Sequence, residues 1–317
     1  MTAPDNWRPT TSTARLQARA DLLQNIRTYF SSQQVMEVET PIISSAGNTD
    51  PEISSIRTQS GKYLRTSPEF ALKRLLAAGS GDIYELGRVF RAGESGRHHN
   101  PEFTMLEWYR TAYTYHQLMD EVATLVRFCG QGKFDQWQQE RLSYKQLFLH
   151  HLNFDPFTAD VETLSACARE NGIDDIELNR KQWLDLLISL VIQPALPEKC
   201  LTFVYDFPED QAALAKIRPG SPPLAERFEL YLGQTELANG YQELTDAVEQ
   251  QQRFEAENEL RHRRGQAVYE LDQNLISALQ HGLPECAGVA MGVDRLLMAI
   301  GELDSIDDVT AFPCART

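Results

Sequence analysis

The chain has 317 residues, which is enough for one large domain or two smaller ones with a sizeable hydrophobic core. Hydrophobic residues make up 42% of it and charged residues 24%, an ordinary globular composition that excludes a largely disordered protein. The formal net charge of −15 disfavours a protein that binds nucleic acid chiefly by neutralising phosphates.

The sequence contains no pattern typical of a membrane segment or an export signal. No run of about 18 apolar residues is present, so we expect no transmembrane helix and no membrane partner. Residues 1–13 are polar and lack the apolar stretch of a secretory signal. The five cysteines form no C-x-x-C pair. This predicts reduced thiols in a cytoplasmic protein, and neither a disulfide framework nor a zinc site.

The N-terminal region predicts a short tail, a helix and a strand. Residues 1–12 carry two prolines and a Thr/Ser cluster, which predicts a flexible tail. Over 13–31 the apolar residues recur every three or four positions, which predicts an amphipathic helix. Residues 35–41 alternate in polarity and end at Pro41, which predicts a strand.

A second helix is expected over 67–78. Ser67 would be its N-cap and Pro68 its first helical residue, because serine caps helices well and proline fits the first turn. Strands over 83–91 and 103–110 follow, separated by a polar, glycine-containing loop.

The remaining elements alternate long helical stretches with strands. The pattern predicts, in order, a mostly helical region over 115–195, a strand over 201–207, a hairpin over 228–237 that turns at Gly233 and Gln234, a helix over 246–264, a strand over 288–292 and a final helix from Asp294. Helices joined to mostly antiparallel strands, without a regular βαβ alternation, predict an α+β fold.

The common nucleotide-binding and hydrolase signatures are missing from the sequence: there is no Walker A loop, no G-x-G-x-x-G, no H-E-x-x-H and no G-x-S-x-G. The sequence instead has charged residues inside segments that otherwise predict buried strands. Because a buried charge is costly unless it is paired or binds a ligand, these residues are the candidates for a functional site.

Two glutamates lie on the predicted hairpin. If Gly233 and Gln234 form a two-residue turn, Tyr231 lies opposite Glu236, and Glu229 lies on the same face as Tyr231. The two carboxylates are then diagonal neighbours that could share Mg²⁺. From spacing alone, a solvated edge hairpin without a ligand is the more common outcome.

Asn239 and Glu243 share one face of the following strand and could line a pocket for a polar, cationic ligand. A half-exposed strand would show the same pattern. Arg91 and Glu107 lie at the end of or within apolar strands, where a structural salt bridge could satisfy both as readily as a ligand.

Two further segments could contact a nucleotide. Residues 97–100 supply several hydrogen-bond donors, and Phe103 could stack on a base. The small-residue strand 288–292 runs into a helix that carries Arg295 in its first turn. Either close approach of a phosphate or tight strand–helix packing would explain the glycines of that strand.

Taken in order, these segments resemble the three signature motifs of the class II aminoacyl-tRNA synthetases. Residues 39–41 resemble motif 1, whose proline lies at a dimer interface. Residues 90–107 resemble motif 2, and residues 288–298 resemble motif 3. The resemblance implies an antiparallel sheet flanked by helices, which forms one catalytic domain over 13–317, and a homodimer.

A finer resemblance is to the catalytic core of lysyl-tRNA synthetase, through residues 68–69, 106–109 and 236–247. A lysyl-tRNA synthetase carries an anticodon-binding domain ahead of this core, and only a dozen residues precede the first helix here, so we expect no such domain. The chain therefore resembles the free-standing paralogues that attach (R)-β-lysine to a lysine of translation elongation factor P. Two small residues agree with this: Ser67 stands where the synthetase has Ala, and Ala290 where it has Gly.

The resemblance also implies a role for each matching residue in ATP-dependent adenylation. Arg91 and Arg295 would be catalytic, holding the α- and γ-phosphates, and Mg²⁺ on Glu229 and Glu236 would bridge phosphate oxygens. The nucleotide would be bound by a set that includes both arginines: Arg91, Glu94, His99, Asn100, Phe103, Glu236, Leu237, Gly292 and Arg295.

At the amino-acid end, the resemblance implies that Glu107, Tyr109 and Glu243 bind the distal ammonium. Ser67 and Glu69 would meet the other amino group and Asn239 the carboxylate, while Ala290 would shape the pocket for (R)-β-lysine. The acceptor would be elongation factor P, and the acidic net charge makes tRNA an unexpected partner.

One position departs from the family pattern. Motif 2 usually reads Arg-x-Glu, whereas this chain has Gly93 at the expected acid and a glutamate one residue later. Glu94 or a backbone carbonyl would then read the adenine amino group. Two alternatives stay open: a truncated lysyl-tRNA synthetase that adenylates α-lysine, and a catalytically silent regulatory paralogue.

Overall fold

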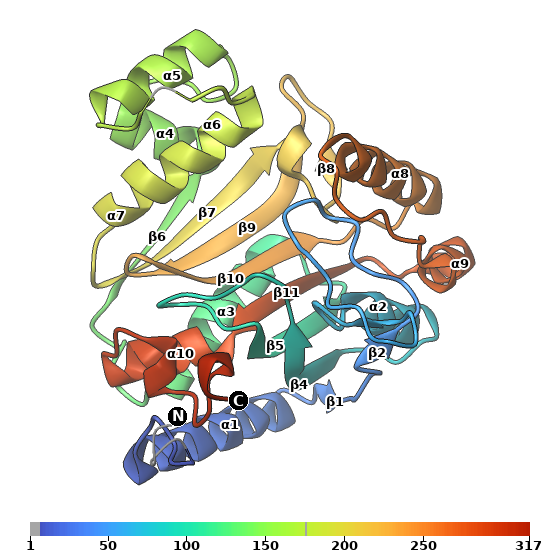
Figure 1. Cartoon of the computed structure of the whole chain (residues 1–317), viewed down its shortest axis with the longest axis vertical. Coiled ribbons are helices and arrows are strands. Elements are labelled where there is room, and N and C mark those ends of the chain that lie inside the picture. The colour runs from blue at the N-terminus through green and yellow to red at the C-terminus, as the bar shows by residue number, and fades with distance from the viewer. Residues whose placement is uncertain (1–6, 175) are drawn as a thin grey trace, which may run out of the picture. The chain divides into compact units, whose positions relative to one another are not determined.

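The computed structural model describes residues 7–174 and 176–317, and these form two compact units, drawn in Figure 1. The first unit comprises Met1–Lys133 and Thr245–Thr317, and the second Phe134–Leu244. The predicted flexible tail, residues 1–12, lies in part outside the described residues. Within its described part, the hydroxyls of Thr10 and Thr11 donate to backbone oxygens of the C-terminal segment.

The main strands of the first unit are hydrogen-bonded in the order β1-β4-β5-β11. Its strands are β1 (Met36–Glu37), β4 (Ile83–Phe90), β5 (Glu102–Thr111) and β11 (Cys286–Gly292). β1 runs parallel to β4, whereas β4–β5 and β5–β11 are antiparallel. A separate pair, β2 (Ile43–Ser44) and β3 (Tyr63–Leu64), forms a small antiparallel sheet.

The helices of the first unit include α1, which begins after Ser12, the residue whose hydroxyl accepts from the backbone N–H of Arg15. Its buried Phe30 stacks on Tyr84 of β4 with ring centroids 4.4 Å apart, which fixes α1 against the core. The helices are α1 (Thr13–Ser32), α2 (Glu69–Ala77), α3 (Tyr115–Gly130), α8 (Ala247–Arg263), α9 (Gln273–Gly282) and α10 (Val293–Gly301), with 3₁₀ turns at Ile306–Asp308 and Cys314–Arg316.

The strands of the second unit are hydrogen-bonded in the order β10-β9-β7-β6, with β8 also paired to β9. Its strands are β6 (Gln138–Ser143), β7 (Cys200–Pro208), β8 (Ile217–Arg218), β9 (Leu224–Leu232) and β10 (Thr235–Gln242). Its helices are α4 (Tyr144–Leu152), α5 (Val161–Glu170), α6 (Arg180–Leu187), a π turn (Ile188–Ile192), α7 (Gln193–Ala195) and a 3₁₀ turn (Glu209–Gln211). Tyr144, Phe148, Trp183 and Phe207 belong to its hydrophobic core.

The α+β fold expected from the sequence is confirmed, and most pairings are antiparallel. The helix expected over 13–31, the strands over 83–91 and 103–110, and the helix over 246–264 are all present within a residue or two of their predicted ends. The hairpin turns at Gly233 as predicted, where a φ of +59° suits glycine.

Two local predictions were wrong in their bounds, and a third missed one strand. The strand expected over 35–41 pairs with β4 only at Met36–Glu37, followed by one backbone hydrogen bond from Val38 N–H to the Tyr84 oxygen, and Pro41 has no N–H with which to extend the ladder. The helix expected from Ser67 begins at Glu69, with Pro68 as N-cap, although the Ser67 hydroxyl still accepts from the backbone N–H of Glu69. The region over 115–195 is mostly helical as expected, but it also contains the unexpected strand β6, whose polar sequence lacks the apolar alternation that predicts a strand.

No helix in residues 7–174 and 176–317 combines the length and the apolar composition needed to cross a bilayer.

Candidate active site

A buried carboxylate lies at the middle of β5. Glu107 is 2% exposed, and two hydroxyls donate to it: Ser67 Oγ to Oε2 at 2.6 Å and Tyr109 OH to Oε1 at 2.8 Å. Tyr109 lies two residues along the same strand and Ser67 lies just before α2, so two elements orient one acid. Both donors are neutral, so these two contacts fix the carboxylate without cancelling its charge.

The strand neighbours of Glu107 set the size and charge of its surroundings. Ala290 on β11 is directly opposite it, and Glu85 on β4 is directly opposite on the other side. Two carboxylates on facing positions repel each other. Arg65 Nη1 offsets this through a buried ion pair with Glu85 Oε1 at 2.5 Å, and Thr40 Oγ1 donates to the other oxygen.

The start of α2 carries a second acid beside Ser67. Glu69 Oε1 accepts from Lys73 Nζ at 2.8 Å, an i,i+4 pair in which the lysine side chain is 1% exposed. A cavity of about 250 Å³ adjoins this turn, and both Ser67 and Glu69 line it together with the loop around Asn48. The Glu69 carboxylate is thus held by an internal ammonium.

The predicted nucleotide-binding residues of motif 2 form a second group in the first unit. The Arg91 guanidinium lies over the ring of Phe103, with 5.2 Å between its central carbon and the ring centroid. It also contacts Glu94 Oε1 at 3.5 Å and the backbone oxygen of Thr66 at 3.4 Å. Gly93 has a φ of +81°, a backbone conformation that the usual glutamate of this motif would adopt only with strain.

His99 and Arg295 lie side by side at the surface of the first unit. Arg295 Nη2 is 2.8 Å from His99 Nε2. Partial burial and then the Arg295 charge lower the pKa of the His99 imidazole below its usual value, while Glu94 acts in the opposite direction. A neutral His99 can accept the Arg295 hydrogen bond. Gly292 packs on Arg295, since a β-carbon there would meet its side chain at 3.7 Å.

Asn100 has a structural role in addition to any contact with a nucleotide. Its side-chain amide donates to the backbone oxygen of Glu102 at 2.6 Å and accepts from the backbone N–H of Cys314 at 3.0 Å. The side chain therefore ties the motif 2 loop to the C-terminal segment.

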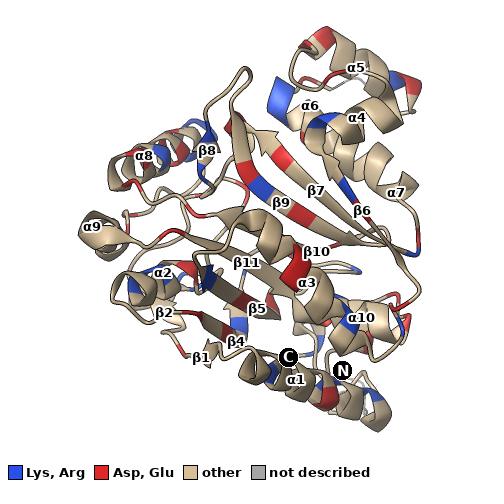
Figure 2. Cartoon of the chain, turned by 180° about the vertical axis from the view of Figure 1, so that it is seen from behind, with Lys and Arg blue, Asp and Glu red and all other residues tan. Residues whose placement is uncertain are grey.

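In the second unit, the two predicted metal ligands lie on the β9–β10 hairpin. Tyr231 is opposite Glu236, as the two-residue turn predicts. Glu229 accepts from Tyr231 OH at 2.7 Å and forms a short ion pair with Arg227 Nη2. Burial alone would lower the pKa of Arg227, but Glu229, Tyr241 and Glu236 raise it. Figure 2 shows the acidic and basic residues along β9.

A bulge at Leu237 changes the register beyond the first pairs of this hairpin. Because of it, Glu229 is opposite Asn239. The buried side-chain oxygen of Asn239 has no hydrogen-bond partner among the described residues. Glu243, just after β10, is 1% exposed. The second unit thus presents an amide oxygen that a ligand could satisfy.

A magnesium ion fits these residues only if its other ligands come from elsewhere. Among the residues that the structure describes, no cluster of three or more His, Cys, Asp or Glu side chains could hold a metal alone. Mg²⁺ commonly keeps waters and phosphate oxygens and takes only one or two carboxylates. The pair Glu229 and Glu236 matches a metal that arrives with a nucleotide.

The structure brings the predicted site residues together in groups within each unit. In the first unit, Ser67 and Tyr109 contact the carboxylate of Glu107. Arg91 lies with Glu94 and Phe103, and His99 lies with Arg295. The second places Glu229, Glu236, Leu237 and Asn239 on one hairpin.

Sequence reasoning missed two cations that pair with candidate acids, Lys73 with Glu69 and Arg227 with Glu229, and it also missed the ion pair of Arg65 with Glu85 beside Glu107. The four-residue spacing of Glu69 and Lys73 on a helix was a usable signal, as was the alternation of Arg227 with Glu229 on one strand face. The pairing of Arg65 with Glu85 joins separate segments and leaves no local signal.

Comparison with known proteins now defines the class. Residues 5–316 match the family of class II tRNA synthetases (D, K and N), and the chain belongs to that family. Among curated proteins, it is 47% identical to the elongation factor P–(R)-β-lysine ligase of Vibrio cholerae serotype O1. It is 46% identical to the proteins of the same name from Yersinia enterocolitica serotype O:8 and Photorhabdus laumondii subsp. laumondii. Each of these alignments covers 100% of both chains.

Proposed function

We propose that this protein is an ATP-dependent ligase that activates (R)-β-lysine as an aminoacyl-adenylate and transfers it to a lysine side chain of translation elongation factor P. The observation that carries the proposal is the buried Glu107, oriented by the hydroxyls of Ser67 and Tyr109 and facing the small Ala290. A desolvated carboxylate with oriented hydroxyls suits a primary ammonium. The names of the full-length relatives agree with this substrate.

The proposed reaction has two steps. In the first, the carboxylate of β-lysine attacks the α-phosphorus of ATP, an acyl–phosphate bond forms, and pyrophosphate leaves. In the second, the amine of the acceptor lysine attacks the acyl carbon, an amide forms, and AMP leaves with loss of one proton from the amine. Both steps depend on positioning and on fixed positive charge near the phosphate oxygens, and they require no side-chain nucleophile.

We assign the phosphate contacts to two arginines of the first unit. Arg91 would hold the α-phosphate and Arg295 the γ-phosphate, while Phe103 stacks on adenine and Glu94 reads its amino group. The remaining nucleotide contacts would come from His99, Asn100, Leu237 and Gly292. The cation–π contact of Arg91 with Phe103 supports this assignment, because it places a charge and a stacking surface side by side.

We assign the contacts with the substrate's amino groups to the acids that match the family motifs. Glu107 with Tyr109, and Glu243, would bind the distal ammonium of β-lysine. Ser67 and Glu69 would meet its other amino group, and Asn239 would meet the carboxylate region. Glu229 and Glu236 would contact the Mg²⁺ that accompanies ATP, whose role when bound is to neutralise charge on the phosphate oxygens.

We further propose a homodimer formed through the motif 1 segment. Three large apolar side chains near Pro41 are exposed: Met36, Ile42 and Ile43 at 49%, 44% and 51%. Exposed apolar clusters of this kind favour a protein interface. Ile43→Asp should therefore convert a dimer to a monomer in analytical ultracentrifugation, and an unchanged sedimentation coefficient would contradict this interface.

Pyrophosphate exchange tests the adenylation step. We expect exchange that depends on ATP and Mg²⁺ and is fastest with (R)-β-lysine, compared with α-lysine and (S)-β-lysine. The matched control is Glu107→Gln, which keeps shape and removes the charge, and should lose exchange without unfolding. Preference for α-lysine together with charging of tRNA would support a truncated synthetase, and an absence of exchange with every isomer would support a silent paralogue.

A further inference from the structure

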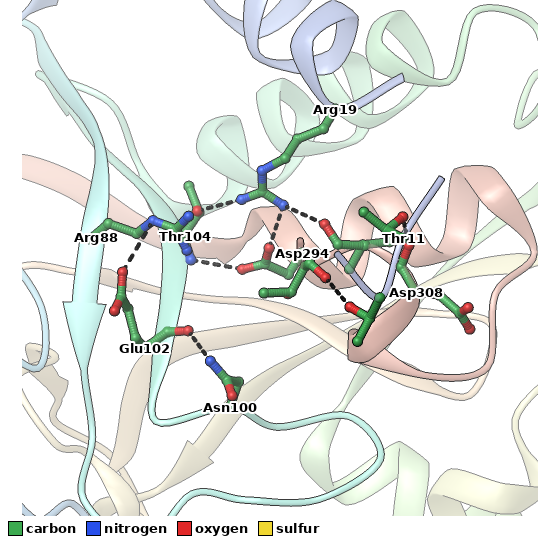
Figure 3. A network of polar contacts seen from close by, with 11 residues as sticks. Thr11, Arg19, Arg88, Asn100, Glu102, Thr104, Asp294 and Asp308 are labelled. Atoms are coloured by element: carbon green, nitrogen blue, oxygen red, sulfur yellow. Dashed lines mark hydrogen bonds and ion pairs between the residues drawn. The ribbon is translucent and has the colours of Figure 1, made fainter. Parts of the chain in front are cut away.

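A buried polar cluster lies on the first unit between α1, β5 and α10 (Figure 3). Arg19 of α1 donates from Nη1 to Asp294 Oδ1 at 2.6 Å and from Nη2 to Thr104 Oγ1 at 2.6 Å. Asp294 Oδ2 accepts from the backbone N–H of Thr104 at 2.7 Å. The side chains of Arg19 and Asp294 are 15% and 4% exposed, so this ion pair is largely shielded from water.

The cluster lies where the pairing of β11 with β5 ends. β11 pairs with β5 down to Gly292 opposite Met105, after which the chain turns into α10. The next backbone N–H on that edge of β5 belongs to Thr104. It is satisfied by the Asp294 side chain, because no strand residue follows Gly292. Arg19 then supplies the opposite charge, which offsets the desolvation cost of burying this carboxylate.

Both anchor points adjoin residues with a proposed role at ATP. Phe103 precedes Thr104, and Arg295 follows Asp294. Since neighbouring strand residues point to opposite faces, Thr104 faces the cluster while Phe103 faces the side on which Arg91 lies over its ring. The contact between residues 104 and 294 therefore fixes the backbone that carries Phe103 relative to the backbone that carries Arg295.

We propose that Arg19 is a positioning residue for nucleotide binding, which acts by fixing Asp294 against Thr104 and so holds Arg295 and Phe103 at a set separation. The inference rests on the proposed function, because it assigns ATP to those two residues. Arg19 touches no substrate in this role. A third contact of Arg19, from Nη1 to the backbone oxygen of Val309 at 3.3 Å, ties the same guanidinium to the C-terminal segment.

The kinetic test uses three variants and a matched control. Arg19→Met removes the charge and both guanidinium donors. Arg19→Lys keeps the charge but has a single nitrogen, which cannot reproduce the separate contacts of Nη1 and Nη2. Thr104→Val replaces the hydroxyl with a methyl group. The control is Arg15→Met, which breaks the more exposed ion pair of α1 with Asp308 on the same C-terminal segment. Misplacement of a substrate-positioning group by about 1 Å can cost on the order of 100-fold in rate.

We expect Arg19→Met to lower kcat/KM for ATP by about 100-fold, chiefly through KM, and to change KM for β-lysine by about twofold or less. Arg19→Lys and Thr104→Val should give intermediate losses in the same parameter, and Arg15→Met should match the wild type. Losses that fall equally on both substrates, or that follow the melting temperature across all four variants, would overturn the proposal.

The titration of His99 gives a readout that needs no catalysis. Partial burial and then the contact with Arg295 lower the pKa of His99, His98 and Arg91 lower it further, and Glu94 raises it. If Arg19 holds Arg295 in place, the pKa of His99 measured by NMR in the folded protein should rise in Arg19→Met and stay unchanged in Arg15→Met. An unchanged His99 in a folded Arg19→Met would overturn the proposal. If the wild type fails to exchange pyrophosphate, the proposed function fails while this titration still decides the positioning role.

Discussion

The two units hold their candidate acids in different ways. In the first, Glu107 is oriented by the neutral hydroxyls of Ser67 and Tyr109. In the second, Glu229 is held by the guanidinium of Arg227 together with the hydroxyl of Tyr231. Neutral hydroxyl donors orient a carboxylate without themselves neutralising its charge, whereas a guanidinium cancels most of that charge.

This difference shows that two glutamates, both predicted as site residues because they are charges inside apolar strands, can have different roles. Burial, followed by Glu229 and Glu236, raises the pKa of Tyr231 well above its usual value, so its hydroxyl stays protonated as a donor. We infer that Glu107 recognises an ammonium, whereas Glu229 is chiefly a structural partner of Arg227 that contacts the magnesium of ATP.

The largest effect should come from removing a cation from the first unit. Arg295→Gln takes away the charge proposed for the γ-phosphate, and we expect kcat for pyrophosphate exchange to fall by about 1,000-fold. The melting temperature should stay close to that of the wild type, because Arg295 is partly exposed. Retained exchange would remove motif 3 from the mechanism.

Glu107→Gln should weaken recognition of the β-lysine ammonium without destabilising the fold. The variant keeps the shape of the side chain but not its charge. The loss of transition-state stabilisation with β-lysine should be about 2–5 kcal/mol, as for other buried charge pairs. Steady-state kinetics should show the loss in the parameters for β-lysine, with KM for ATP little changed. An equal loss for ATP would contradict a role in amine recognition.

Glu229→Gln should behave in the opposite way. It leaves the Arg227 guanidinium without its ion-pair partner, and we expect unfolding free energy to fall by about 1–3 kcal/mol because the pair is partly shielded from water. Urea denaturation measures this directly. The comparison between the units is wrong if Glu107→Gln proves the less stable of the two variants.

Ala290→Gly should enlarge the space opposite Glu107 by one methyl group. We expect the ratio of kcat/KM values for (R)-β-lysine and α-lysine to shift toward α-lysine by about 1–3 kcal/mol, or about 10- to 200-fold. Parallel exchange assays with the two isomers give this ratio. A ratio equal to that of the wild type would remove Ala290 from substrate selection.

The smallest effect concerns pH. Because the pKa of His99 in the folded protein lies below the usual 6.5, the unfolded chain binds more protons at this residue. Its contribution to stability is therefore constant well above 6.5 and becomes unfavourable as pH falls through that value. Denaturation curves should show the wild type losing more stability than His99→Gln on acidification. Parallel curves would show that His99 is not perturbed.

Much of the fold could be predicted because the deciding signals are local. The apolar spacing over 13–31 marks α1, and the start of α8 is marked by Asp246, whose side chain accepts from the backbone N–H groups of Val248 and Glu249. The two-residue turn at Gly233 fixes the register that puts Tyr231 opposite Glu236.

The failures concern contacts that local patterns do not encode. The bulge at Leu237 changes which residue faces Glu229, and nothing in the spacing of the strand marks it. Serine is a residue type favoured at N-caps, yet the Ser67 hydroxyl donates to Glu107 on a distant strand. The candidate acids were found because charges inside apolar strands are unusual, whereas the ion pair of Arg65 with Glu85 beside Glu107 joins two separate segments and leaves no local pattern.

Mass spectrometry of elongation factor P after incubation with this protein, ATP, Mg²⁺ and (R)-β-lysine tests the central claim most directly. We predict that the acceptor gains one β-lysyl group on a lysine side chain, located by peptide sequencing, and that the gain is lost with Arg295→Gln. An unmodified acceptor in the presence of β-lysyl-adenylate, or modification of tRNA in its place, would contradict the account.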